Sequence, residues 1–397
     1  MEFIFENLKT KIKDSCDVLV AGGGFAGIAA ALAAARNGAK TILVENQFIL
    51  GGLGTAGIVT IYLPLCDGAG NQVSFGIAEE LLRLSVKMGW EDTYPDLWMK
   101  DCSSEERKKG PRFETGFNPH LFAINSEQLL LGAGVKILYG TRVCSVAKEA
   151  KKISSVIVEN KSGRYAIKVK SVVDSTGDAD VCAMAGAKTD TFKQGNLLAA
   201  WYYAIKDNKP LRVPLGECDT PDEYKTAQTD PDLAARGRFL GLDGEELTEL
   251  VCRSHSFMMD DIINKKKLNP EYVPVNMPSI PQVRMTRKLV GTTVLDDKAD
   301  HENFSDSIGL FGNWRKRGPA FALPFGSLYG NEIENLITAG RCISTTESMW
   351  ELTRVIPVCC VSGEAAGTAA AISDNFAVLD IAKLQNILKK SGVKLFF

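Results

Sequence analysis

Three glycines near the N-terminus have the spacing of a dinucleotide-binding turn. Gly22, Gly24 and Gly27 follow an apolar run and precede an Ala-rich segment. In such a turn the first glycine permits a tight bend, the second lets the backbone approach a pyrophosphate, and the third lets helix and strand pack closely. Phosphate charge then lies at the N-terminus of the helix. The spacing therefore predicts a dinucleotide site.

Glu45 and a second Gly-rich segment favour the same site. Glu45 closes the next apolar run, about 20 residues after the glycines, where an acidic residue binds ribose hydroxyls. Four glycines then occur between residues 51 and 57, flanked by Leu50, Leu53 and Ile58. A flexible surface loop is the alternative interpretation, but this composition favours a backbone that lies against a ligand.

Polar residues also follow a later apolar run and precede a late helix. Residues 171–174 are followed by the segment 175–180, Ser-Thr-Gly-Asp-Ala-Asp, and the carboxyl ends of parallel strands are where α/β sheets bind ligands.

Arg354 precedes Pro357, which suits the first turn of a helix rich in small residues. The N-terminal amides of that helix would carry partial positive charge toward the site. An Ala-rich core helix is the alternative, and the two interpretations are compatible.

Composition limits the function classes. With 397 residues, 45% hydrophobic and 24% charged, the chain is long enough for two or three packed domains. A net charge of -2 gives no electrostatic footprint for nucleic acid or an anionic membrane. The ten cysteines show no CxxC spacing, so we expect no zinc or iron–sulfur site, and reduced thiols fit a cytoplasmic protein.

No segment has the pattern of an export signal or a membrane span. Residues 1–13 lack the ordered basic, apolar and small-residue regions of a signal peptide. Residues 18–35 carry no charge, but the glycines break this run where a strand must turn into a helix. We therefore expect a βα unit here and no membrane span.

The order of the strands and helices expected around these residues predicts an α/β fold. The first βα unit is expected to lead into a parallel sheet, and a small β-meander follows it. The strands expected after the first unit are residues 135–139, 141–146, 153–159, 165–169 and, as a separate buried strand, 171–174.

Five motifs in this order resemble FAD-dependent oxidoreductases of the glutathione-reductase-type superfamily, and more narrowly flavoproteins similar to the flavin region of heterodisulfide reductase. The resemblance runs from about residue 15 to 373 and is weakest from 192 to 275. The motifs are Gly22-x-Gly24-x-x-Gly27, Gly51-Gly52, Asp174 to Asp180, Ala339 to Ser344, and Arg354-Val-Ile-Pro357. They are specific for FAD and not for a substrate.

The resemblance implies a contact for each matching position. Gly22, Gly24 and Gly27 would hold the pyrophosphate, and Glu45 the adenosine ribose. Val143 would meet the adenine through its backbone. The remaining positions expected to bind the cofactor are Phe25, Ala26, Asn46, Gly52, Leu53, Thr55 and Ala56 around the first two loops, Thr176, Gly177 and Asp178 along the nucleotide, Gly340 and Arg341 at the ribityl chain, and Pro357 and Val358 at the pyrimidine end of the ring.

Candidate catalytic residues come from positions beside these motifs. Arg284-x-x-Arg287 matches a family pattern, and Arg287 with Arg354 would hold a carboxylate, a polar sugar or an anionic flavin, although surface ion pairs are the alternative. Many relatives carry His at position 347 and Arg at position 326, where this chain has Glu347 and Gly326. We take Glu347 and Tyr329 as the candidates for proton transfer.

Cys342 and the adjacent Cys359 and Cys360 do not have the spacing of a disulfide reductase. We expect them to be buried thiols.

We expect a Rossmann-like FAD-binding domain, with a parallel sheet and β-meander, formed by residues 14–75, 120–190 and 326–397. An α+β cap or substrate domain would comprise residues 191–325 together with 76–119. The expected function is a dehydrogenase or reductase that transfers hydride between flavin and a small polar metabolite, sugar-derived or carboxylated. The alternative is a flavin-bearing subunit that exchanges electrons with a protein donor or acceptor.

Overall fold

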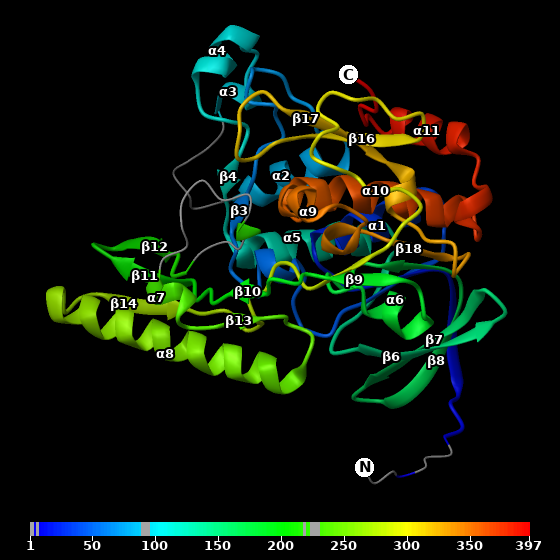
Figure 1. Cartoon of the computed structure of the whole chain (residues 1–397), viewed down its shortest axis with the longest axis horizontal. Helices are drawn as coiled ribbons and strands as arrows, with labels where there is room; N and C mark the ends of the chain where they lie inside the picture. Colours follow the sequence, from blue (N-terminus) through cyan, green and yellow to red (C-terminus); the bar gives the residue numbers. More distant parts are fainter. Residues whose placement is uncertain (1–3, 5–7, 89–95, 217–219, 223–230) are drawn as a thin grey trace.

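A seven-stranded sheet forms the centre of the computed structural model, which describes residues 4, 8–88, 96–216, 220–222 and 231–397 (Figure 1). The strand order is β5-β2-β1-β8-β7-β6, and β18 also pairs with β8. Strands β5, β2, β1, β8 and β18 run parallel, whereas β8, β7 and β6 form an antiparallel meander. The strands are β1 Ile12–Ala21, β2 Thr41–Val44, β5 Lys136–Leu138, β6 Arg142–Glu149, β7 Lys152–Asn160, β8 Gly163–Asp174 and β18 Leu336–Thr338.

Strand β8 joins the two parts of this sheet. Its first half pairs with β7, and its last three residues, Val172 to Asp174, pair with β18. The expectation of two separate strands at 165–169 and 171–174 was therefore wrong. The strand continues through exposed Lys170 because β1 pairs with it on the other edge from Ala166 to Asp174.

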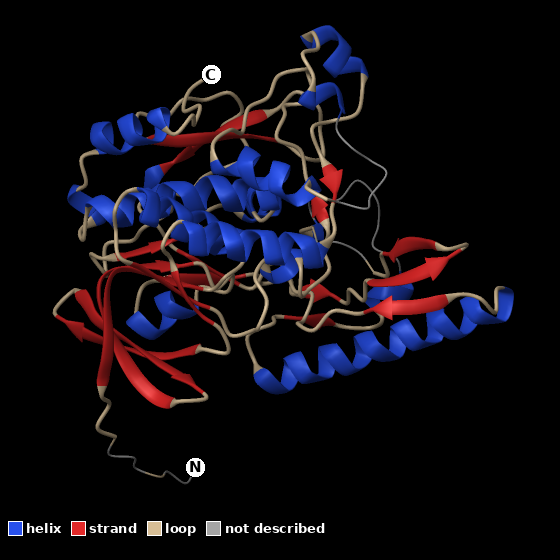
Figure 2. Cartoon of the chain, turned by 180° about the vertical axis from the view of Figure 1, so that it is seen from behind, coloured by secondary structure: helices blue, strands red, loops and turns tan. Residues whose placement is uncertain are grey.

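Two helices rich in small residues pack on the sheet. Helix α1, Phe25–Arg36, and helix α10, Ile356–Ile372, are almost fully buried and lie side by side (Figures 1 and 2). A Cβ added at Gly363 would overlap the carbonyl oxygen of Ala26, and one at Gly367 would overlap that of Ala30. The Ala- and Gly-rich composition thus lets the two backbones approach closely.

A second core lies in the segment between β9 and β15. Sheet β12-β11-β14 packs on the long helix α8, with Tyr202, Met258 and Tyr272 among the buried residues between them. The elements of this part are β9 Thr189–Thr191, β10 Asn196–Leu197, β11 Tyr202–Lys206, β12 Lys209–Val213, α7 Pro231–Ala234, β13 Arg238–Phe239, α8 Gly244–Leu268, β14 Val273–Asn276 and β15 Arg287–Leu289.

Most of the remaining elements lie in the upper part of Figure 1, whereas α6 lies beside β6 in the lower part. The remaining elements are η1 Gly52–Gly54, β3 Ile61–Tyr62, α2 Ile77–Val86, α3 Asp96–Met99, α4 Ser104–Lys109, β4 Thr115–Gly116, α5 Pro119–Gly132, α6 Asp180–Ala185, β16 Ser307–Gly312, β17 Ala320–Pro324, η3 Phe325–Ser327, η4 Gly340–Cys342, α9 Glu347–Thr353, η5 Phe376–Val378 and α11 Ile381–Lys390.

The architecture confirms the expected α/β class with a Rossmann-like sheet and a β-meander. Within the described residues no single helix is long and apolar enough to span a membrane, and only α9 and α10 together, bent by 90°, meet the criteria of length and composition.

Candidate active site

The turn between β1 and α1 depends on its first and third glycines for different reasons. Gly22 has φ 97°, and an added Cβ would lie 2.6 Å from the carbonyl oxygen of Ser175. A Cβ at Gly27 would overlap the carbonyl oxygen of Gly22. Gly24 has ordinary extended backbone, and no atom lies within 4 Å of the position of an added Cβ. Gly24 therefore faces open space, whereas the other two are required by the chain itself.

Glu45 is fixed at the end of β2 by backbone donors. Its carboxylate accepts hydrogen bonds from the N–H of Gly23 and the N–H of Gln47, each 2.7 Å long. Burial raises the pKa of Glu45, and these hydrogen bonds oppose that change. The side chain is thus held in one orientation beside the first glycine loop.

The second glycine loop is joined to the first. The N–H of Gly51 donates to the carbonyl of Gly23 over 2.8 Å, and Gly24 and Gly51 form an isolated bridge. Gly51 has φ 101°, a conformation that favours glycine. Thr55 donates its hydroxyl to the carbonyl of Leu50 and so stabilises the loop from behind.

The segment after β8, residues 175–178, contacts both the turn between β1 and α1 and residues 283–287, which follow β14. Ser175 donates to the carbonyl of Gly22 over 2.9 Å. Arg341 donates to Asp178 over 3.2 Å and to the carbonyl of Arg284 over 2.7 Å. Asp178 also accepts a 2.6 Å hydrogen bond from Thr286. These contacts hold residues 283–287 against the end of the parallel sheet.

These segments enclose a cleft of about 540 Å³. Fifteen of the residues expected to be functional line it. They are Gly22, Gly24, Phe25, Ala26, Glu45, Asn46, Gly52, Leu53, Val143, Thr176, Gly177, Asp178, Gly340, Arg341 and Arg354.

Most of the cleft wall is therefore built from the segments that sequence reasoning singled out. A family model described as FAD dependent oxidoreductase matches residues 17–197 and 242–388, most of the chain. The protein belongs to this family. FAD is its cofactor, and the protein is an oxidoreductase.

Curated relatives match only part of their own length. The thiamine thiazole synthase of Methanococcus vannielii is 32% identical over 184 residues, which cover 43% of this chain and 60% of that enzyme. The thioredoxin reductase of Ureaplasma parvum is 35% identical over 75 residues, which cover 19% of this chain and 24% of that enzyme. The chain thus matches less than two thirds of either relative.

Solved structures are similar at lower identity. A geranylgeranyl bacteriochlorophyll reductase-like protein from Thermoplasma acidophilum has a TM-score of 0.45 and 15% identity, covering 96% of this chain and 82% of that one. The L-proline dehydrogenase from P. horikoshii has a TM-score of 0.42 and 13% identity, covering 90% of this chain and 93% of that one.

The residues around the cleft fit FAD. Open space at Gly24 leaves room for a group that a side chain would fill. Glu45 offers an acceptor, and Arg142 and Arg341 add cations for a dinucleotide that carries negative charge. The oxidoreductase would therefore hold the cofactor along the ends of β1, β2 and β8.

Arg354 is the predicted catalytic residue that reaches the cleft wall. It lies just before α10, and its guanidinium Nη2 is 3.4 Å from Oε1 of Glu351. Glu351 is buried and also accepts a 2.7 Å hydrogen bond from Arg315. Ile356 and Cys359 at the start of α10 line the same cleft. The arginine is thus held beside a helix N-terminus, which also favours negative charge.

Arg287 lies behind the cleft wall in an ion pair. Its guanidinium is 2.7 Å from Asp180 and donates to the carbonyl of Asp178 over 2.9 Å. Burial, followed by the nearby carboxylates of Asp178 and Asp174, raises the pKa of Asp180 to about 6, and Arg287 opposes this change. Asp180 itself lines the cleft, whereas Arg287 does not, so Arg287 acts on the cleft through its ion pair with Asp180.

Glu347, Tyr329 and five cofactor candidates are not among the residues that line the cleft. Glu347 is the first residue of α9. The ring of Tyr329 lies against Phe325, with 5.1 Å between centroids. The five candidates are all buried, and they are Gly27, Thr55, Ala56, Pro357 and Val358.

Sequence reasoning missed several residues that line the cleft. Arg142 is next to the predicted Val143, so extending that position by one residue would have found it. Asp180 ends the motif that begins at Asp174, but it was not named as a site residue. Five further lining residues come from the segment between β13 and β15, namely Gly241, Leu247, Ile280, Pro281 and Val283. No motif marks these five, because only the tertiary fold brings them to the cofactor-binding segments.

The cysteines agree with the sequence expectation. Cys342, Cys359 and Cys360 are buried and form no disulfide. Burial raises the pKa of the Cys359 thiol to about 12, so this thiol remains protonated at neutral pH.

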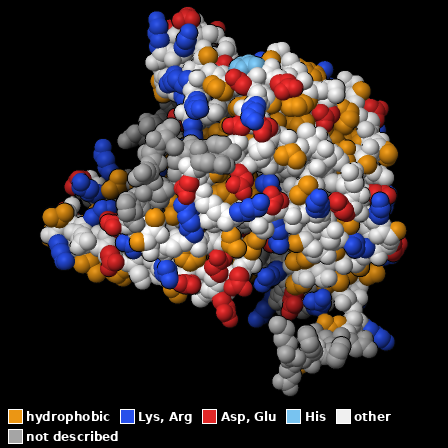
Figure 3. All heavy atoms as spheres, in the orientation of Figure 1, with side chains coloured by type: hydrophobic (Ala, Val, Ile, Leu, Met, Phe, Trp, Pro, Cys, Tyr) orange, Lys and Arg blue, Asp and Glu red, His pale blue; other side chains and the backbone are white. Residues whose placement is uncertain are grey.

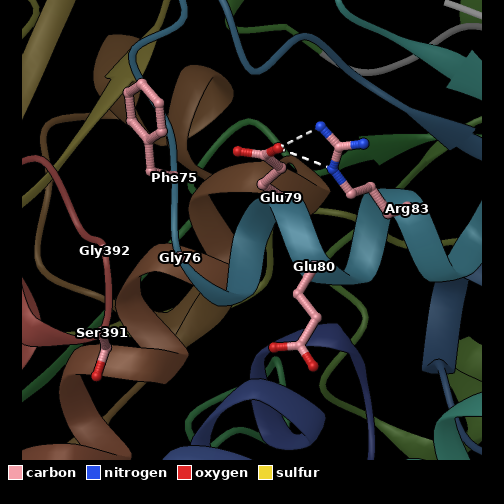
Figure 4. A pocket seen from close by; sticks show the side chains of 7 residues that line it. All are labelled: Phe75, Gly76, Glu79, Glu80, Arg83, Ser391 and Gly392. Carbon is pink, nitrogen blue, oxygen red and sulfur yellow. Dashed lines mark hydrogen bonds and ion pairs between the residues drawn. The ribbon is translucent and has the colours of Figure 1, made fainter. Parts of the chain in front are cut away.

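A second hollow, of about 390 Å³, lies away from these segments (Figure 4). It is lined by Phe75, Gly76, Glu79, Glu80, Arg83, Ser391 and Gly392. Glu79 and Arg83 form an ion pair across one helical turn. None of the predicted site residues lines this hollow, so the larger cleft is the candidate active site.

Proposed function

We propose that this oxidoreductase transfers hydride between bound FAD and a small anionic or polar metabolite, carboxylated or sugar-derived. The observation that carries the proposal is Arg354 on the cleft wall, buried beside the N-terminus of α10. A planar guanidinium can bind two oxygen atoms at once and so fix the orientation of a carboxylate. FAD supplies the two-electron chemistry, and the protein supplies binding and orientation.

The apolar part of the cleft supports an enzyme with its own substrate. Ile280, Pro281 and Val283 line the cleft, and Leu247 of α8 also lines it. This segment lies beside the end of the second glycine loop, because the N–H of Ser279 donates to the carbonyl of Ala56 and the side chain of Gln282 donates to that of Gly57. Apolar residues over a redox centre exclude water and favour a closed substrate site. An electron-transfer subunit would instead expose the flavin edge beside an apolar docking patch.

Glu351 is the positioning residue in this proposal. Its buried carboxylate contacts both Arg354 and Arg315, so it helps to fix the orientation of the Arg354 guanidinium at the cleft wall. Arg287 acts further away, by fixing Asp180. Glu347 and Tyr329 stay as our candidates for proton transfer.

We also propose the wider setting of the protein. The order of the motifs supports the glutathione-reductase-type superfamily, and the similarity to the flavin region of heterodisulfide reductase. The division into an FAD domain (14–75, 120–190, 326–397) and a cap (191–325 with 76–119) follows the same motifs. The nine cysteines that the structure describes are all free, which supports a reducing compartment such as the cytoplasm.

Anaerobic reduction tests the function. The FAD-loaded protein is mixed with a panel of hydroxy acids, amino acids and sugar acids, and loss of the flavin absorbance is followed. We expect at least one anionic compound to reduce the flavin or, in the reverse direction, to oxidise the reduced flavin. Reactivity only with protein electron carriers would support the subunit instead.

A variant pair then tests Arg354. Arg354→Lys keeps the charge but loses the planar fork, so the rate of flavin reduction should fall while FAD occupancy stays near wild type. Arg315→Lys, further along the same network, is the matched control and should change the rate less. A wild-type rate in Arg354→Lys would remove this residue from the substrate site.

A further inference from the structure

Helix α8 has one face in the cap core and the opposite face in solvent. Leu250, Ser254 and Met258 are buried against the sheet β12-β11-β14. Figure 1 shows α8 along the lower edge of the molecule, with this sheet above it. The residues of the opposite face recur every three or four positions, which places them on one side of the helix.

This opposite face, which we name the outward stripe, consists of Glu245, Glu249, Cys252, Ser256, Met259, Ile263 and Lys267, all of them exposed. Met259 is 56% exposed and Ile263 is 45% exposed. The part of the surface where α8 lies shows hydrophobic side chains between charged ones (Figure 3). Adjacent large apolar side chains in water favour an interaction surface.

The charges of the outward stripe are ordered along the helix. Its N-terminal end is acidic, with Glu245 and Glu249, and its C-terminal end is basic, with Lys267. This order stabilises the dipole of the helix itself. In an antiparallel second copy of the helix, the basic end would also lie against the acidic end of the first.

The stripe is complementary to itself about Ser256. Ser256 lies midway between Glu245 and Lys267, and Cys252 and Met259 lie at nearly equal distances on either side of it. In an antiparallel pair with Ser256 of both copies at the centre, Glu245 of each copy would face Lys267 of the other. Glu249, whose carboxylate pairs with Arg253 on its own helix, would lay its aliphatic stem against Ile263 of the other copy. Met259 would then cover Cys252, and the small serines would let the helix axes approach to about 8–10 Å.

We propose that a second copy of this chain binds the outward stripe, giving a symmetric homodimer through antiparallel α8 helices. Such a contact uses the same surface on both copies, as a two-fold axis requires. Leu247 and the neighbouring Gly241 line the cofactor cleft from the start of this helix. The dimer would therefore hold one wall of each cleft in place.

Light scattering and sedimentation equilibrium of the FAD-loaded full chain test the proposal. We expect a dimer at micromolar concentration. Ile263→Asp should raise the dimer dissociation constant by about tenfold or more, because the two-fold symmetry places each new carboxylate opposite Glu249 of the other copy, so the repulsion occurs twice. Val378→Asp is the control, since Val378 is 77% exposed on η5 and lies outside the stripe. A wild-type monomer, or a dimer that Ile263→Asp leaves unchanged, would overturn the proposal.

A charge exchange tests the antiparallel direction. Glu245→Lys alone and Lys267→Glu alone should each raise the dissociation constant by about three- to tenfold, because each exposed ion pair is weak but occurs twice. The double variant should return to near the wild-type value. Additive losses in the double variant would contradict the pairing of these two residues.

Crosslinking tests the register. Ser256→Cys in a Cys252→Ser background should form an intermolecular disulfide, because facing Cα atoms at the centre lie within about 7 Å. The two wild-type Cys252 residues would lie about 12 Å apart along the helix, too far for a bond. The wild type and Cys252→Ser alone should thus stay uncrosslinked. A dimer in which the Ser256→Cys variant forms no disulfide would refute this interface.

Discussion

Replacing Glu364 by glutamine should make the stability of the protein less dependent on pH. Glu364 is 3% exposed within α10 and accepts a 2.8 Å hydrogen bond from the N–H of Ile77, the first residue of α2. Gly76, which lines the hollow of Figure 4, lies directly against this carboxyl group. Burial raises the pKa of Glu364 from 4.5 to about 8, with a smaller contribution from Glu80.

The sign of the effect follows from proton binding. Between about pH 4.5 and about pH 8, Glu364 in the folded protein keeps a proton that the same residue in the unfolded chain has released. The contribution of Glu364 to the free energy of unfolding is therefore greatest below about pH 4.5 and falls as the pH rises toward 8. At about 1.36 kcal/mol for each pH unit, the wild type should lose about 3 kcal/mol from this group between pH 6 and pH 9. Glu364→Gln still accepts the hydrogen bond but does not titrate.

Urea unfolding at pH 6 and pH 9, with FAD at saturation, measures the difference. The free energy of unfolding of Glu364→Gln relative to wild type should rise by about 3 kcal/mol between the two pH values. Glu79→Gln is the matched control, because Glu79 lies on the same hollow and pairs with Arg83 at the surface. Parallel pH profiles for wild type and Glu364→Gln would refute the reasoning.

Three further predictions concern the cleft and its supports. Glu45→Ala should weaken FAD binding by about 1.5–3 kcal/mol in a flavin titration, because a charge-assisted hydrogen bond is lost. Gly363→Ala should lower the free energy of unfolding, measured in urea, by about 1–3 kcal/mol, because the added methyl overlaps the carbonyl of Ala26. Gly132→Ala is the control and should not lower it, because the added methyl there meets open space. Arg287→Lys should lower the unfolding temperature more than the rate of flavin reduction, because Arg287 pairs with Asp180; a large loss of rate at unchanged stability would instead place Arg287 at the substrate.

The sequence predicted the parts of the site that depend on local geometry. The turn at Gly22 and the start of α10 at Pro357 could be predicted because glycine and proline fix the backbone where they stand. The antiparallel pairing of β7 and β8 was also expected as part of the β-meander, because the two strands are neighbours in the chain.

Other features depend on partners far apart in the chain. Strand β8 was expected as two strands because its continuity comes from pairing with β1 and β18, which no local pattern reveals. The cleft wall at Ile280 and Val283 is made by a segment without a motif. The ion pair of Arg287 was left open for the same reason, because its partner Asp180 lies on another element.

FAD binding by Gly24→Val tests the account most directly. Gly24 has extended backbone and open space at its Cβ, so valine should leave the fold intact, in contrast to substitutions at Gly22 or Gly27. Circular dichroism and urea unfolding of the FAD-free proteins should therefore match the wild type. In a flavin titration we expect no FAD binding by this variant, because the side chain fills the space for the pyrophosphate. Wild-type affinity in a folded Gly24→Val protein would contradict the assignment of the cleft as the FAD site.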